Sequence, residues 1–282
     1  MRRLAAMLMA VFLAAGPAAA QEPPPYQIER SAVLGLDSAL LKRRYEVYVK
    51  LPPGYDLPEN AGRRYPVLYL TDGPYTFQVA SGVSRLTHSQ KSLEEFILVG
   101  LSRAVGGDEQ ASRRRDYTPW RNPAIEGETG GALAYLQHLK AEVLPLVEQR
   151  YRIDPKRRTL VGQSYGALFG MWVALTEPEL FRGYILTSTS IWFADKALLK
   201  LEAEQASRRK DLKADIYLAV GGLERGRVDM VADQAELAKR LKSRKYPGLR
   251  LRADTIEGTV HETTFPVGLV HALMWLFPPR AS

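Results

Sequence analysis

The chain has 282 residues, of which 25% are charged, with 39 Lys and Arg against 31 Asp and Glu. It contains no cysteine, which excludes disulfides, thiol nucleophiles, thiolate zinc sites and an N-terminal lipid anchor on cysteine. The basic residues are scattered and accompany no base-reading motif, so we expect no nucleic-acid partner and interpret the charge as favouring an anionic small substrate or an anionic envelope surface.

Residues 1–20 have the pattern of a secretory signal peptide. Arg2 and Arg3 form a basic region, Leu4 to Ala15 an apolar region, and three alanines ending at Ala20 a cleavage site. We expect residues 21–282 to remain as one periplasmic or secreted domain, with 37 basic against 31 acidic residues and a net charge of about +6. No later segment approaches the roughly 20 apolar residues of a membrane helix, so we expect no stable membrane insertion.

Short apolar segments alternate with amphipathic ones along the rest of the chain. The segment 44–52 alternates like a half-exposed strand, and five apolar runs end in turn residues like buried strands: 65–73, 95–102, 158–163, 183–190 and 215–222. Helical spacing is found over 130–151 and 229–243, before a last strand within 245–258. This order predicts an α/β fold with a mostly parallel central sheet of about eight strands flanked by helices.

The stretch "RTLVGQSYGALFG" places Ser164 between a predicted strand and a predicted helix that stops near Pro178. Gly162 and Gly166 flank the serine, and a sharp strand-to-helix turn needs glycine there because a side chain would collide with the neighbouring backbone. The pattern predicts a nucleophile elbow, with the Tyr165 N–H facing a developing oxyanion. The alternative is a glycine-punctuated junction without chemistry.

A serine nucleophile needs a general base, and the chain has four histidines. His261 follows the last predicted strand in a loop and lies after the serine, as the chain order Ser, acid, His requires. His88 and His138 precede the serine, and we expect His271 to pack within an apolar C-terminal helix. Phe265 stands where a zincin would carry its second histidine, so the sequence predicts no metal and no cofactor.

The acid should leave the end of a strand between the serine and the histidine. Glu224 follows the run "DIYLAVGGL", where a turn would bring its carboxylate toward the His261 loop. Asp229 and Asp233 are alternatives, although both fall within the next helical pattern. We expect Glu224 to orient the imidazole.

Several segments together resemble the putative-esterase branch of the α/β-hydrolases, which includes feruloyl esterases and the trilactone hydrolases that open catecholate siderophores such as enterobactin. They are "PVLYLTDGPYTF", "RRRDYTP", "YRIDPKRRTLVGQSYGALFG", "STSIWF" and "GTVHETT". The resemblance implies an α/β-hydrolase fold and ester hydrolysis through an acyl-serine on Ser164, with His261 as the base and Glu224 at the acid position. It also implies that the Gly73 N–H joins that of Tyr165 in the oxyanion hole. Some siderophore-hydrolysing relatives lack a third carboxylate and work as Ser-His pairs.

The segment from Arg113 to Trp120 is expected to be a long Arg-rich loop. Its arginines either form ion pairs that hold the loop or face the cleft; we select Arg114, Arg115, Tyr117, Trp120 and Trp192 as candidate substrate contacts. Cations beside aromatic rings suit an anionic ferric catecholate siderophore, which is the predicted substrate of an exported esterase. A feruloyl, acetyl or short-chain ester remains the alternative substrate, and a non-catalytic binding protein of the same fold the alternative class.

Overall fold

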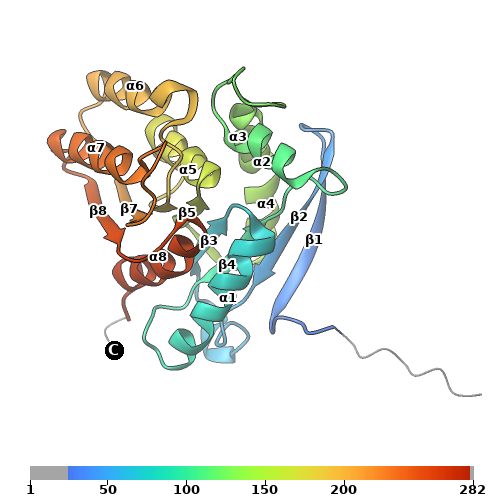
Figure 1. Cartoon of the computed structure of the whole chain (residues 1–282). Helices are drawn as coiled ribbons and strands as arrows, with labels where there is room; N and C mark the ends of the chain where they lie inside the picture. Colours follow the sequence, from blue (N-terminus) through green and yellow to red (C-terminus); the bar gives the residue numbers. More distant parts are fainter. Residues whose placement is uncertain (1–24, 280–282) are drawn as a thin grey trace, which may run out of the picture.

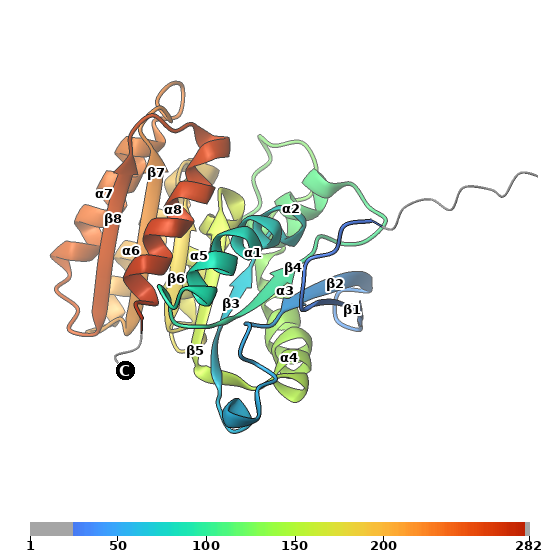
Figure 2. The ribbon, with the colours of Figure 1, turned by 90° about the horizontal axis from the view of Figure 1, so that it is seen from below.

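A computed structural model describes residues 25–279, so the predicted signal peptide lies outside the described residues. One eight-stranded sheet, in the order β1-β2-β4-β3-β5-β6-β7-β8, runs through the molecule (Figure 2). Its strands are β1 (Ser31–Ser38), β2 (Arg43–Lys50), β3 (Tyr65–Leu70), β4 (Ile97–Leu101), β5 (Ile153–Gln163), β6 (Gly183–Thr187), β7 (Ala214–Gly221) and β8 (Leu249–Ile256). The β1–β2 and β2–β4 pairs are antiparallel and all other pairs are parallel. The predicted sheet is thereby confirmed.

Two layers of helices cover the two faces of the sheet (Figure 1). The helices α1 (Gly73–Ser89) and α8 (His261–Leu276) pack on one face. The other helices are α2 (Glu109–Tyr117), α3 (Ala132–His138), α4 (Leu144–Arg150), α5 (Tyr165–Thr176), α6 (Phe193–Arg208) and α7 (Met230–Ser243). The central strands β3, β4, β6 and β7 are buried at every residue, as expected for parallel strands covered on both sides.

Three expectations about the helices need correction or refinement. The segment 130–151 is helical from Ala132 to Arg150, but a π-helical turn η2 (Leu139–Val143) lies between α3 and α4; Pro145 follows at the start of α4 and cannot donate a backbone hydrogen bond. The Arg-rich segment is mostly the helix α2 and not a loop, because Asp108 caps it by accepting a hydrogen bond from Ala111 N at 2.6 Å. His261 begins α8 and does not lie in a loop.

Candidate active site

Ser164 lies in the turn between β5 and α5, at the edge of the sheet where the parallel strands end. Its backbone has φ 58° and ψ −117°, a combination that is sterically costly for any residue with a side chain. The Ser164 N–H donates to the carbonyl of Thr187 at 3.0 Å, which attaches the turn to the end of β6. The predicted strand, sharp turn and helix are therefore present around this serine.

Both flanking glycines are required by close backbone approach. A Cβ on Gly162 would overlap the carbonyl group of Gly166 and lie 2.7 Å from the nitrogen of Ala167. A Cβ on Gly166 would overlap the hydroxyl oxygen of Thr71, at the end of β3. The turn can be this tight only because neither position carries a side chain.

Glu224 and His261 form a hydrogen-bonded pair, with 2.7 Å between Glu224 Oε2 and His261 Nδ1. The Glu224 side chain is 3% exposed and that of His261 is 36% exposed, so the acid is buried and the imidazole reaches the surface. The second carboxylate oxygen, Oε1, lies 2.6 Å from Ser188 Oγ, 2.8 Å from Gly221 N and 3.0 Å from Thr264 Oγ1. These contacts leave Oε2 directed at the imidazole.

The same contacts keep Glu224 charged. Burial by itself would raise the pKa of Glu224, but hydrogen bonds from His261, Ser188 and the Gly221 N–H outweigh burial and lower the pKa below its ordinary value. An ionised carboxylate at Nδ1 favours the imidazole tautomer that carries its proton there and leaves Nε2 as an acceptor. The pair is therefore prepared to accept a proton at Nε2.

Two hydrogen bonds hold the elbow: one joins Gln163 to His261 and the other joins Ser164 to Ser190. Gln163 Nε2 donates to the carbonyl oxygen of His261 at 2.5 Å, which holds the start of α8 beside the elbow. Ser164 Oγ lies 3.2 Å from Ser190 Oγ. Among the described residues no hydrogen bond joins Ser164 Oγ to the His261 imidazole, so the serine hydroxyl points to Ser190 in this conformation.

Gly73 and Tyr165 each begin a helix, α1 and α5. Backbone N–H groups in the first turn of a helix have no acceptor within that helix, and no other described residue accepts a hydrogen bond from either one. A Cβ on Gly73 would lie 2.9 Å from the carbonyl oxygen of Leu101, so glycine allows α1 to begin this close to the end of β4. Both N–H groups remain available to an oxyanion.

Arg113 and Asp72 form a mostly buried ion pair beside this backbone. Arg113 Nε and Nη2 donate to the two carboxylate oxygens of Asp72 at 2.6 and 3.1 Å. Asp72 directly precedes Gly73 and has a left-handed backbone, with φ 56°, and its N–H donates to the Tyr117 hydroxyl at 3.2 Å. The Arg113 guanidinium also lies 5.8 Å from the centre of the Tyr165 ring. Arg113 thus contacts both segments that carry the free N–H groups of Gly73 and Tyr165.

The five candidate substrate contacts differ in their surroundings. Tyr117 is 1% exposed, so the structure corrects this assignment: the side chain packs in the core and supports Asp72. Arg115 binds Asp116 at 2.8 and 3.1 Å and is committed to that pair. Arg114 has no acidic partner among residues 25–279, and Trp120 and Trp192 are partly exposed. For these three, substrate contact stays a prediction.

The other titratable candidates have separate positions. Asp229 caps α7 by accepting from Ala232 N at 2.9 Å, and Asp233 pairs with Lys196. His138 is buried and binds Glu142. The expectation that His271 is packed is wrong, since its side chain is exposed on α8. Position along the sequence therefore distinguished His261 and Glu224 from most of the other candidate bases and acids.

Sequence reasoning did not select four residues that hold the site together. They are Thr264, Ser188, Ser190 and Gln163. Ser188 and Ser190 come from the run "STSIWF", whose alternating serines were the available signal. One of them binds the acid and the other binds the elbow serine.

An elbow serine, a histidine beside a buried acid and two free N–H groups at the ends of parallel strands define the α/β-hydrolase class of proteins. No helix within residues 25–279 is long and apolar enough to cross a membrane. The sequence profile of the putative esterase family matches residues 38–276. The chain belongs to this family and is an esterase.

Comparisons with individual proteins are consistent with membership of this family. The chain is 29% identical over 269 residues to the ferri-bacillibactin esterase BesA of Bacillus subtilis, covering 90% of this chain and 92% of that protein. The solved structure of the BES protein from Bacillus cereus is similar with a TM-score of 0.80 and 26% identity, over 92% of this chain and 99% of that one. The siderophore hydrolase EstB from Aspergillus nidulans has the same fold, with a TM-score of 0.77 at 22% identity, over 92% of this chain and all of that one, 100%.

Proposed function

We propose that this esterase acts through a covalent acyl-serine on Ser164. The observation that carries the proposal is the 2.7 Å pair of Glu224 and His261 beside the elbow, with the His261 carbonyl held by Gln163. In this mechanism the Ser164 side chain rotates away from Ser190 and donates its hydroxyl proton to His261 Nε2. Hydrogen bonds between nucleophile and base are often long before substrate binds and tighten in the complex.

The reaction then proceeds in two balanced halves. Ser164 Oγ attacks the ester carbonyl while His261 Nε2 takes its proton, and the resulting oxyanion accepts hydrogen bonds from the N–H groups of Gly73 and Tyr165. The imidazolium, stabilised by Glu224, gives the proton to the departing alcohol. Water attacks the acyl-serine by the same route, which releases the acid and restores the serine.

A fluorophosphonate probe tests this mechanism. We expect it to label Ser164 in the purified protein, and we expect Ser164→Ala to abolish both labelling and turnover of p-nitrophenyl butyrate. Ser207→Ala, which changes an exposed serine on α6, is the matched control and should behave like the wild type. Full turnover by Ser164→Ala would refute the acyl-serine, whereas a wild type that is neither labelled nor active would favour a binding protein of the same fold.

We further propose that the substrate is an anionic siderophore ester of the trilactone catecholate class, and that the protein is exported to the periplasm or secreted. Support for the substrate comes from the names of the similar proteins and from Arg114. Burial raises the pKa of Tyr165, and the charges of Arg113 and Arg114 oppose this rise. Arg113 is paired with Asp72, whereas Arg114 has no acidic partner among the described residues, so we propose Arg114 as a cation that binds an anionic substrate.

The substrate is tested by comparing kcat/KM for apo and ferric enterobactin, methyl ferulate and p-nitrophenyl butyrate. We expect a siderophore form to be preferred, and Arg114→Gln to lower kcat/KM for it while leaving the neutral butyrate ester unchanged. A tenfold preference for either monoester corresponds to about 1.4 kcal/mol of transition-state free energy. That result would refute the siderophore assignment and leave the esterase mechanism intact.

A further inference from the structure

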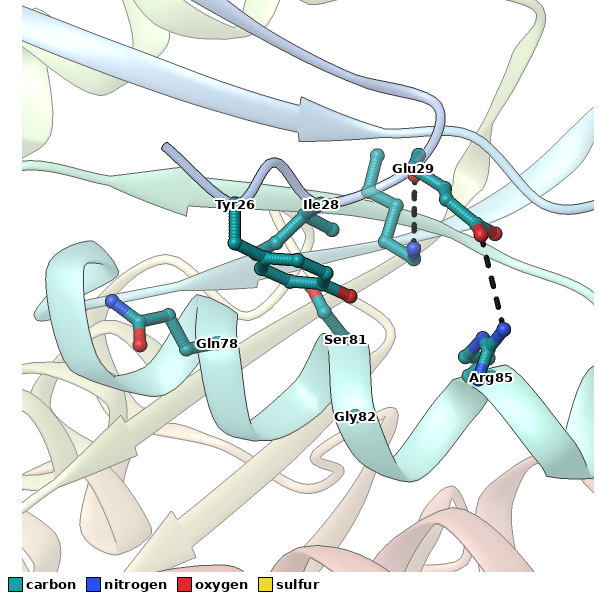
Figure 3. A pocket seen from close by; sticks show the side chains of 8 residues that line it. Tyr26, Ile28, Glu29, Gln78, Ser81, Gly82 and Arg85 are labelled. Carbon is teal, nitrogen blue, oxygen red and sulfur yellow. Dashed lines mark hydrogen bonds and ion pairs between the residues drawn. The ribbon is translucent and has the colours of Figure 1, made fainter. Parts of the chain in front are cut away.

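A cavity lies away from the elbow, between α1 and the first described segment of the chain (Figure 3). It measures about 400 Å³, a size typical of sites for small molecules. Its lining includes Tyr26, Glu29, Lys50, Ser81, Gly82 and Arg85. Lys50 ends β2 and pairs with Leu98 near the start of β4, so it lies toward the end of the sheet opposite Ser164.

Lys50 is an unusual lysine because it is only 7% exposed. An ammonium group has three N–H donors, and Lys50 Nζ uses one of them on the carbonyl oxygen of Glu29, at 3.0 Å. No other described residue accepts a hydrogen bond from it. Burial lowers the pKa of Lys50, and Arg30 and Arg85 lower it further while Glu29 raises it. Two of the three donors of Lys50 Nζ therefore remain available to a ligand in the cavity.

The charges around the cavity do not balance. Of the charged residues that line the cavity, Lys50 and Arg85 are cations and Glu29 is a carboxylate, 3.8 Å from Arg85. One acid against two bases leaves an excess of one positive charge, and Arg30, 3.6 Å from Glu29, adds a further cation beside the cavity. A buried charge without a full partner is costly; Lys50 is the buried one of these charges, since Arg85 and Glu29 are exposed, so an anion in the cavity would stabilise it.

The shape of the cavity adds a place for an apolar group. A Cβ built on Gly82 would meet no atom within 4 Å, so the middle of α1 forms an open floor. Figure 3 shows the Tyr26 ring above this helix, with Ser81 beneath the ring and Arg85 one turn further along. An aromatic or aliphatic body between the ring and Gly82 would place its charged end near Lys50 and Arg85.

We propose that this cavity binds a small phosphate monoester, with the phosphate held by Lys50 and Arg85 and its organic group held between Tyr26 and Gly82. A phosphate monoester carries a charge of about −1.5 to −2 at neutral pH, which suits the two lining cations and Arg30 beside them. Arginine binds two phosphate oxygens at once and lysine adds a compact point charge. The site is independent of the ester chemistry at Ser164.

Phenyl phosphate is the probe, and calorimetric titration with the complete protein is the measurement. We expect binding to the wild type, at least about tenfold weaker binding to Lys50→Met, and loss of binding in Gly82→Leu, which fills the cavity with a good helix former. Lys210→Met removes one charge from an exposed position on another part of the surface and should bind like the wild type. All variants should retain p-nitrophenyl butyrate hydrolysis, which reports on folding.

Two further arms distinguish the source of the phosphate. We expect phenyl phosphate to bind more tightly than inorganic phosphate, and we expect no Lys50-dependent binding to phosphatidylcholine vesicles that contain phosphatidic acid. Wild-type binding that both Lys50→Met and Gly82→Leu retain would overturn the proposal, as would no binding of phenyl phosphate at all. Vesicle binding that depends on Lys50, without binding of phenyl phosphate, would assign the site to a lipid surface and overturn it too.

Discussion

Replacing Glu224 by glutamine should stop catalysis by changing the imidazole tautomer while leaving the fold intact. Glu224 Oε1 lies 2.8 Å from Gly221 N, and a backbone N–H can only donate. The glutamine must therefore keep its oxygen at this position, and its NH₂ group must face His261 Nδ1. Both groups would be donors unless the imidazole moves its proton to Nε2, where it can no longer accept the proton of Ser164.

The loss of kcat caused by the wrong imidazole tautomer is known to an order of magnitude. Replacing the triad acid by its amide lowers kcat by about 10⁴-fold in serine proteases, which corresponds to about 5.5 kcal/mol of activation free energy. We expect a loss of this order for Glu224→Gln in steady-state hydrolysis of p-nitrophenyl butyrate. The Tm should change little, because the oxygen that accepts from Gly221, Ser188 and Thr264 is retained.

Asp229→Asn is the matched control, since it also converts an acid to its amide close along the chain. Asp229 caps α7, and asparagine is an equally good cap, so kcat should stay near that of the wild type. A Glu224→Gln enzyme that keeps more than about a third of the wild-type kcat would show that the acid is not required. The enzyme would then work as a Ser-His pair.

Three further predictions concern the supports of the site. Gly162→Ala should lower the unfolding free energy in urea by about 1–3 kcal/mol or more, because the new methyl overlaps the elbow backbone; an unchanged midpoint would contradict this. Arg113→Met should lower kcat more than it changes KM, since it leaves Asp72 buried without its cation, and adding Asp72→Asn should restore part of the lost stability if the pair is the cause. Burial alone would raise the pKa of Glu142, but hydrogen bonds from Ser38 and His138 outweigh it and lower the pKa below its ordinary 4.5. The ionised Glu142 therefore stabilises the fold above about pH 4.5, and this stabilisation is lost as the pH falls below that value. Glu142→Gln should make the unfolding free energy, measured in urea, depend less on pH in this acidic range.

Local sequence patterns predicted the elements that depend on short-range physics. The elbow could be located because the steric need for Gly162 and Gly166 lies within five residues of chain. The buried strands were visible as continuous apolar runs. His271 was misjudged because α8 carries apolar residues on its outer face as well: Val267, Val270 and Met274 are all exposed beside it, so hydrophobicity alone did not reveal which side faces the sheet.

The Arg-rich segment shows a second limit of predicting structure from local sequence. Its composition suggested a loop that offers several side chains to a substrate, whereas α2 directs Tyr117 into the core and Arg113 toward Asp72. A helix distributes neighbouring residues around its axis, so adjacent positions meet different partners. Which arginine stays free is decided by the acids that the rest of the fold brings near.

By itself the sequence determined the fold class, the elbow serine and the order in which serine, acid and histidine follow one another, because glycine sterics, hydrophobic period and chain order are all readable along the chain. The tertiary structure alone decided that Glu224 reaches His261 across 37 residues, and that Gln163 holds the same histidine across 98. It also decided that Lys50 faces a cavity with an excess of positive charge. These contacts depend on which strands pair and which helix ends meet, and burial then sets the strength of each charge and hydrogen bond.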